Sequence, residues 1–413
     1  MLACVVVNTY VAWVRMQTSR AAAAGFVSKD ESTPLAFGIN GGRDLDSPNH
    51  KLPWEIAMGV NAFLVAVVFI LTGLLLGGSL VQANGYRSFP PRGNFVSLVS
   101  PSGHPLTVMV QCTGAANASQ ATIVFDVGGG GHSSTDLYGM QLALNDAGHR
   151  VCTYDYPGCG WSGYGDDALQ PQILEQILTA INEPAPYILL GTMDGGPTRI
   201  YDYALRYPQN VRALVVIDYS PGPSEMEGYK IMRNYTDSQA TEYAVETIQS
   251  RFDLGNIVRG LAVQWGLMSI FAPPGTTFVP ASMQTEKLFL NLYNEKQWQT
   301  QVAMLARQIA DPPLLFGYDL WATNRTLSDT IPVWWFYNNV NITRTCVDYA
   351  YTTTRCEEAQ KSQSMTYPYI VQATNMTSGS KIIQYEDARD MLSQGQYIPW
   401  TVGLILENIN SLL

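Results

Sequence analysis

The residues with the clearest chemical meaning form a glycine-rich turn that follows the apolar run Tyr187–Leu190. The turn consists of Gly191, Thr192, Met193, Asp194, Gly195 and Gly196. A strand, a G-x-S-x-G turn and a helix, in this order, present a catalytic serine at a sharp bend. In this chain the serine position holds Met193, and a thioether has no proton to lose and is a poor acyl acceptor. The pattern therefore predicts the bend without its nucleophile.

Two further loops carry residue types that suit the same chemistry. A run of glycines that ends in a histidine follows the strand-like segment 122–127, and it comprises Gly128, Gly129, Gly130, Gly131 and His132. Such glycines let the backbone turn freely and aim N–H groups at a developing oxyanion. The second loop reads D-x-P-G-x-G-x-S from Asp155 to Ser162. We interpret Ser133, Ser134 and Ser162 as turn and helix-cap residues.

The elements that would position these loops alternate between strands and helices, which predicts a largely parallel sheet covered on both faces. Strands are expected at 95–100, 106–112, 122–127, 150–155, 187–190, 213–218, 333–337 and 382–385. Helices are expected between them at 134–147, 170–181, 193–206 and 401–413. The segment 221–329 interrupts this rhythm with helical patterns at 242–252, 256–267, 284–293 and 295–309. Insertions at this place often become lids over a pocket.

Three of these segments resemble the α/β-hydrolase superfamily. Residues 122–133 are similar to its oxyanion loop, residues 148–163 to the turn after its fourth strand, and residues 190–218 to its nucleophile turn with the following helix and strand. The resemblance is close over 95–220 and diffuse over 330–413. It implies an α/β-hydrolase fold, which is a mostly parallel eight-stranded sheet with helices on both faces and a helical lid insertion. An N-terminal transmembrane segment, predicted from its own apolar sequence, precedes this fold.

The catalytic triad of that family is not preserved in this sequence. The family needs a nucleophile, an acid and a histidine in this chain order. This chain has Met193 in the first position, reaches an acid after the seventh strand only at Asp348, and has no histidine beyond His149. We interpret it as an inactive member that acts as a binding or structural subunit. The alternative is an active ester or epoxide hydrolase that uses Asp194 as nucleophile or His132 as base.

One uncharged apolar segment, residues 56–81, is long enough to cross a bilayer, which takes about 20 apolar residues. The alternative is a buried core helix, although core helices seldom lack charge for this length. A second apolar stretch, residues 2–14, is too short for a complete span. We interpret it as part of a second span or as a buried arm, and the alternative is the core of a signal peptide.

Basic residues predict the orientation of the span. Five of them precede the main span, at Arg15, Arg20, Lys29, Arg43 and Lys51, whereas only Arg87 and Arg92 follow closely. Positive residues favour the cytosolic side, so the C-terminal domain is expected in a lumen or outside the cell. All five N-x-S/T sequons lie in that domain, at Asn117, Asn234, Asn324, Asn341 and Asn375, and predict a glycoprotein. An organellar membrane, where the sequons would be accidental, is the alternative.

The cysteines predict disulfides rather than a metal site, because no C-x-x-C motif occurs among the six. Cys346 and Cys356 flank a short polar segment and are able to close a small loop, the alternative being two free thiols. The family resemblance implies a second pair. In that fold the second strand runs antiparallel beside the fourth, so Cys112 and Cys152 would meet across them, the alternative being two buried thiols.

We divide the chain into an N-terminal arm (1–55), a transmembrane helix (56–81), a first core segment (82–220), a lid (221–329) and a second core segment (330–413). Residues 15–55 of the arm are polar and need a contact in order to be ordered, so protein partner subunits are expected besides the bilayer. A small-molecule ligand in the former catalytic pocket is a further option. The net charge of −10 without basic blocks argues against nucleic acid. No motif indicates a cofactor.

Overall fold

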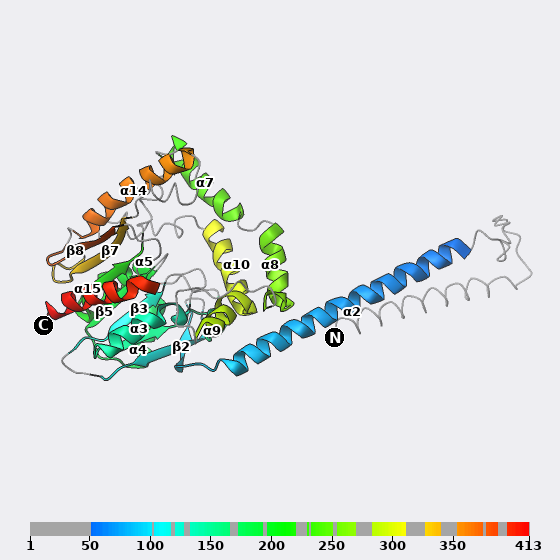
Figure 1. Cartoon of the computed structure of the whole chain (residues 1–413), viewed down its shortest axis with the longest axis horizontal. Helices are drawn as coiled ribbons and strands as arrows, with labels where there is room; N and C mark the ends of the chain where they lie inside the picture. Colours follow the sequence, from blue (N-terminus) through cyan, green and yellow to red (C-terminus); the bar gives the residue numbers. More distant parts are fainter. Residues whose placement is uncertain are drawn as a thin grey trace, which may run out of the picture. The chain divides into compact units, whose positions relative to one another are not determined.

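The architecture of the chain comes from a computed structural model (Figure 1). It describes residues 51–100, 103–116, 120–127, 133–165, 172–192, 196–219, 229–230, 233–250, 254–269, 283–310, 327–339, 353–374, 377–386 and 395–412. The chain divides into two compact units, residues 1–76 and 77–413. The sheet and the lid belong to the second unit, which we call the globular unit.

One sheet forms the centre of the globular unit. Its strands are β1 (Asn94–Val99), β2 (Pro105–Thr113), β3 (Ile123–Val127), β4 (Val151–Tyr154), β5 (Tyr187–Thr192), β6 (Val211–Ile217), β7 (Val333–Asn339) and β8 (Lys381–Glu386). The order across the sheet is β1-β2-β4-β3-β5-β6-β7-β8. β2 runs antiparallel to β1 and β4, and all other neighbours are parallel. The predicted mostly parallel, eight-stranded sheet is confirmed.

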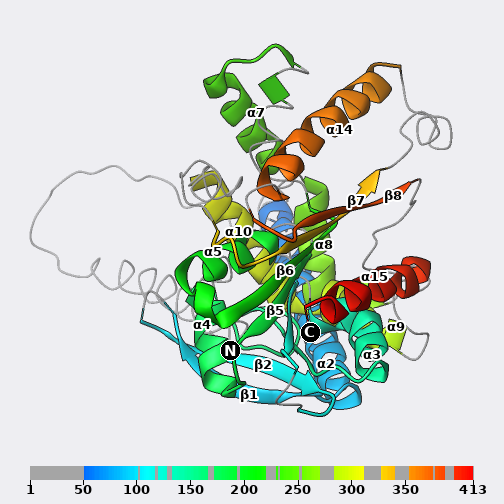
Figure 2. The same cartoon turned by 90° about the vertical axis from the view of Figure 1, so that its left-hand side faces the viewer.

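Helices cover both faces of this sheet, as predicted. On one face lie α4 (Gln172–Ile181), α5 (Gly196–Arg206) and α14 (Thr353–Thr374), and on the other lie α3 (Tyr138–Asp146) and α15 (Ile398–Asn410). Figure 2 shows α4 and α5 on one side of the strands and α3 and α15 on the other. Within β3, Val124 packs into the first layer and Phe125 into the second. Burial on both faces explains why the central strands are continuous apolar runs.

The sequence does not predict α14, because this helix is polar and contains Pro368 in its interior. The parallel pairing of β7 with β8 nevertheless requires a long crossover connection. α14 provides that crossover and buries Ile370 in the core layer that α4 and α5 share. Its position is therefore set by sheet topology and by a few apolar contacts, not by a repeating apolar stripe.

The long N-terminal helix α2 (Lys51–Ser88) extends beyond the predicted segment 56–81 at both ends. Its part Met58–Ser88 is long and apolar enough to cross a membrane, with a mean hydropathy of 2.6 in a window that is only 6% buried. The residues from Gly77 onward belong to the globular unit. They continue the helix although they are more polar, because they pack against the lid.

The lid connects β6 to β7 and is mainly helical in its described part, as expected. It contains α7 (Asp237–Ser250), α8 (Leu254–Gln264), a short helical turn (Leu267–Ser269), α9 (Gln284–Leu288), a π-helical turn (Phe289–Tyr293) and α10 (Glu295–Ala310). The end of α2 contacts this segment closely. A Cβ atom at Gly85 would lie 2.1 Å from the ring of Phe289, and Asn294 donates a hydrogen bond of 2.8 Å to the Tyr86 hydroxyl.

Candidate functional site

The two glycine loops begin side by side at the carboxyl ends of neighbouring parallel strands. Val127, the last residue of β3, lies opposite Thr192, the last residue of β5. The segments that follow, Gly128–His132 and Met193–Gly195, lie outside the described residues. The register of β3 and β5 therefore brings the start of the oxyanion-type loop next to the start of the predicted nucleophile turn.

The described ends of the nucleophile turn show how tightly the chain bends. α5 begins at Gly196 and returns so close to β5 that a Cβ atom at Gly191 would lie 2.7 Å from the backbone nitrogen of Pro197. The same Cβ would lie 2.9 Å from a methyl group of Ile200. Only glycine fits at Gly191, because its missing Cβ is what lets the helix approach the strand.

A buried carboxylate lies beside the strand ends at which these two loops begin. Asp126, next to the last residue of β3, is completely buried and forms an ion pair of 2.9 Å with Arg199 in α5. The Tyr154 hydroxyl donates a hydrogen bond of 2.9 Å to the same carboxylate, and the Tyr156 hydroxyl donates another. The carboxylate therefore joins β3, the end of β4 and the first turns of α5.

The guanidinium group of Arg199 completes this cluster. It also donates to the backbone carbonyl of Val127 at 3.2 Å and stacks 4.1 Å from the centre of the Tyr156 ring. Burial, together with the nearby Asp126 carboxylate, raises the pKa of the Tyr154 phenol well above its usual range. The phenol therefore stays protonated and remains a hydrogen-bond donor at neutral pH.

Sequence reasoning misses the Asp126–Arg199 pair. The available signal is a single acid in the otherwise apolar strand 122–127, because a charged residue in a buried strand requires a partner. The identity of that partner depends on the helix after β5, and the two residues are 73 positions apart. No local pattern in the sequence connects them.

The loop with the D-x-P-G-x-G-x-S sequence folds around its own aspartate. Asp155 accepts backbone hydrogen bonds from Ser134 at 2.6 Å and from Trp161 at 2.9 Å. A Cβ atom at Gly160, whose φ is +50°, would lie 2.1 Å from the Asp155 carboxylate. Burial raises the pKa of Asp155 to about 6. The Ser162 hydroxyl donates to the Asp155 carbonyl at 2.6 Å, which is a turn-forming contact.

The lid is fastened to the segment that follows the oxyanion-type loop. Asp136 is buried, accepts a hydrogen bond of 2.9 Å from the Ser133 backbone, and forms an ion pair of 2.8 Å with Lys287 of the lid. The side-chain amide of Asn291, also in the lid, donates to Asp136 at 3.2 Å. Ser133 and Asp136 thus cap the turn that leads into α3 and also hold the lid.

A second lid residue, Lys296, reaches the loop after β4. Its ammonium group donates to the carbonyl of Gly160 at 3.0 Å and to the carbonyl of Ser162. Burial lowers the pKa of Lys296 to about 8, against a smaller opposing effect of the Asp155 carboxylate. Close by, a Cβ atom at Gly158 would overlap the side chain of Thr300 at 1.8 Å. The lid and this loop therefore fit together without room for larger side chains.

The described histidines lie away from the nucleophile turn. His149 is buried just before β4, at the opposite end of the parallel strands, and burial lowers its pKa. His104 is exposed at the start of β2, in the hairpin at the sheet edge. His132 lies outside the described residues. Among the histidines that the structure describes, none is placed to serve as a base at the end of β5.

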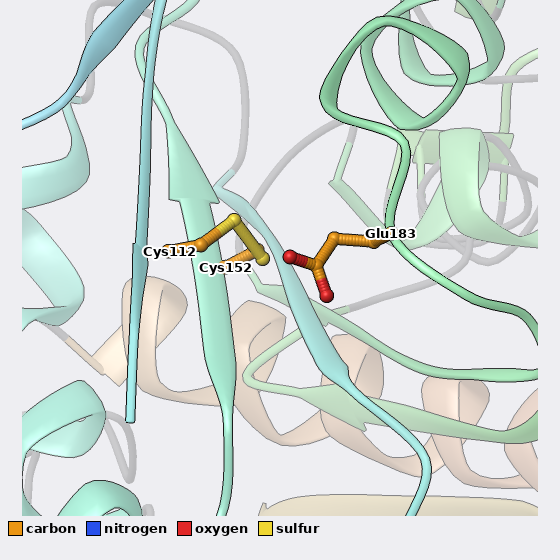
Figure 3. A group of neighbouring side chains, drawn as sticks. All are labelled: Cys112, Cys152 and Glu183. Atoms are coloured by element: carbon orange, nitrogen blue, oxygen red, sulfur yellow. A yellow bond between two sulfur atoms is a disulfide. The ribbon is translucent and has the colours of Figure 1, made fainter. Parts of the chain in front are cut away.

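Cys112 and Cys152 are joined by a disulfide between β2 and β4. Figure 3 shows the Glu183 carboxylate beside the bridge, and the sulfur and oxygen atoms of the three residues lie within 4.8 Å of one another. The sulfurs are bonded to each other, and Glu183 accepts hydrogen bonds of 2.9 Å from Arg150, which lower its pKa. This group is accordingly a cross-strand bridge beside an ion pair rather than a metal site.

The remaining predicted residues are only partly described. Cys356 is disulfide-bonded, while Cys346 lies outside the described residues. Asn234 occupies an exposed turn before α7 with a φ of +54°. The other sequon asparagines lie outside the described residues, and these are Asn117, Asn324, Asn341 and Asn375.

The topology and the tight strand-to-helix turn define a class of protein. A mostly parallel sheet with a helical lid after β6, and a glycine-lined bend between β5 and its helix, are the architecture on which a nucleophile turn is built. Residues 119–310 match the family model described as the alpha/beta hydrolase fold. The globular unit therefore has the α/β-hydrolase fold.

Several solved structures align with the chain at low identity. A probable hydrolytic enzyme from Pseudomonas aeruginosa PAO1 is 16% identical with a TM-score of 0.49, covering 76% of this chain and 93% of that chain. An epoxide hydrolase mutant from Vigna radiata is 12% identical with a TM-score of 0.47, covering 78% of this chain and 99% of that chain. A haloalkane dehalogenase variant from Bradyrhizobium elkanii is 14% identical with a TM-score of 0.47, covering 77% of this chain and 98% of that chain. No curated protein matches the chain.

Replacement of Arg199 by methionine is expected to destabilise the fold strongly. The change leaves the Asp126 carboxylate buried without its cation, which costs about 3–5 kcal/mol of unfolding free energy. Arg206→Met is the control, because Arg206 is 37% exposed in its pair with Asp202 and should contribute less than about 1 kcal/mol. Urea unfolding followed by tryptophan fluorescence measures both. Equal losses in the two variants would contradict the assigned role of Asp126–Arg199.

Lys296 is expected to make stability depend on pH in the alkaline range. Because its folded pKa of about 8 lies below its ordinary value of 10.5, the unfolded state holds a proton in this window that the folded state has released. The contribution of this group to stability therefore rises between pH 8 and 10.5 and is lowest below pH 8. Lys296→Met should remove this rise when unfolding free energies are measured across the window. Parallel pH curves for the two proteins would be the contrary result.

Proposed function

We propose that this chain is a membrane-anchored α/β-hydrolase-fold glycoprotein without hydrolase activity, which acts as a binding or structural subunit. One observation carries the proposal. The position of the nucleophile is Met193, and the sequence contains no histidine after His149 that could act as base in the family's chain order. Loss of two groups that act together leaves neither an attacking atom nor a group to receive its proton.

The contacts of the lid support a domain that does not exchange substrate. Asp136 pairs with Lys287, and the Lys296 ammonium is held by loop carbonyls. Opening the lid would exchange these contacts for contacts with water, and the net contribution of a hydrogen bond to a charged group is about 1.5–3 kcal/mol. A closed lid of this kind favours binding or bracing over repeated turnover.

The end of α2 supports a retained anchor rather than a signal sequence that is removed. Gly78, within the apolar segment, packs so closely against the end of α8 that a Cβ atom there would lie 1.8 Å from the carbonyl oxygen of Gln264. Cleavage after the apolar segment would remove this residue, which is part of the packed globular unit. The orientation that fits the basic residues has this unit in a lumen or outside the cell.

The purified full-length chain in detergent is expected to show no esterase or epoxide hydrolase turnover above a buffer blank. The assay uses p-nitrophenyl esters, a fluorescent epoxide and a fluorophosphonate probe. Met193→Ser should stay equally inactive, because it restores an attacking oxygen without a histidine to activate it.

The matched test of the alternative is Asp194→Asn. Turnover by the unsubstituted chain that disappears in this variant, with an unchanged urea midpoint, would replace the proposed function by an active hydrolase with an aspartate nucleophile. Turnover that survives the substitution would point to other residues and would equally overturn the inactive assignment.

Glycosylation tests the proposed orientation. After expression in a eukaryotic secretory system, the chain should lose mass on treatment with an N-glycosidase and should resist alkaline extraction from membranes. Asn234→Gln should reduce the mass shift by one glycan, because this sequon lies in an exposed turn. A chain whose mobility does not change with the glycosidase would place the globular unit on the other side of the membrane or in an organelle.

A further inference from the structure

The end of α8 contacts α2 backbone to backbone. A Cβ atom at Gly78 would lie 1.8 Å from the carbonyl oxygen of Gln264, so only glycine fits. On the other side, a Cβ atom at Gly266 would lie 3.1 Å from the Cα of Gly78, and Gly266 has a φ of +71°. Glycines on both sides permit this approach, as small residues do where helices pack inside membranes.

Gly78 marks the end of the part of α2 that suits a bilayer. A hydrocarbon core of about 30 Å takes about 20 helical residues. Counted from Ile56, the first residue after Glu55, that length ends at about Leu75, one helical turn before Gly78. The helix then becomes more polar, with Gln82, Asn84 and Arg87 in its last turns. The contact with Gln264 consequently holds the end of α8 at the boundary between hydrocarbon and headgroups.

α8 has one packed face and one exposed apolar face. Val263 is buried, and Gly260 lies against the indole of Trp298 in α10. On the other face Val258 is 55% exposed and Leu261 is 38% exposed. These two residues are three positions apart and therefore neighbours on the helix surface. They are the exposed large apolar side chains within the described part of the lid.

The two observations point to one occupant of that face. Gly78 holds the end of α8 at the depth where an apolar side chain meets lipid, and the exposed apolar face belongs to the same helix. Trp265, which directly follows α8, is the residue type enriched at this boundary. We propose that α8 is an interfacial helix that lies on the bilayer, with Val258 and Leu261 among the lipids. This inference rests on the proposed membrane anchor.

The test uses the full-length chain in phosphatidylcholine vesicles with one environment-sensitive fluorophore attached to a new cysteine. Leu261→Cys reports the proposed lipid contact, and Val258→Cys repeats it in case the first variant misfolds. Leu142→Cys in α3 is the control, because Leu142 is also 38% exposed. Phe69→Cys reports the anchor itself, and the unsubstituted chain, labelled in parallel, supplies the blank.

Labels at Leu261 and Phe69 are expected to shift their emission to the blue and to lose fluorescence when the vesicles contain brominated lipids, whereas the label at Leu142 does neither. Quenching at Phe69 without quenching at either α8 position would overturn the inference and leave the anchor intact. Absence of quenching at Phe69 would overturn the anchor and this inference with it. A blue shift at Leu261 without quenching would mean that protein covers the face, which also refutes the lipid contact.

Discussion

The buried ion pair between Asp126 and Arg199 is the interaction on which the candidate site depends. A carboxylate without exposure is tolerated only when every lone pair finds a donor, and here a guanidinium and two phenols supply them. The donors come from α5 and from the end of β4, while the acceptor is in β3. The position of the carboxyl ends of β3 and β5, where the two glycine loops begin, is therefore fixed by electrostatics as well as by strand register. A nucleophile is not needed to keep this geometry.

The same logic extends outward to the lid. Asp136 and Lys296 are charged groups whose partners lie across the boundary between the lid and the core loops. Each is satisfied only while the two parts are together. The glycines at 158 and 160 make the fit possible, since any side chain there would overlap Thr300 or the Asp155 carboxylate. What binds the lid is thus a set of specific polar contacts around a small area of close packing.

Local patterns in the sequence predict the sheet, the lid helices and the tight bend, because each depends on neighbouring residues. Gly191 predicts the bend, and the apolar runs predict the strands. The sequence does not predict α14, because this helix is polar and interrupted by Pro368, and its position depends on sheet topology and on a few apolar contacts such as that of Ile370. The Asp126–Arg199 pair escapes because its members meet only after two strands have paired. The last turns of α2 escape because contacts with Phe289 and Asn294, rather than hydropathy, keep them helical.

The bridge between Cys112 and Cys152 has a mechanical consequence. The linker after α2 leads directly into β1. Once the contacts of α2 and its linker with the lid are broken, tension applied to the membrane helix would therefore enter the sheet at its edge and peel the β1–β2 hairpin from the remaining strands. Hydrogen bonds broken one after another resist such peeling weakly. The disulfide ties β2 to β4 covalently, so unzipping stops at the second strand and the load passes to the interior of the sheet.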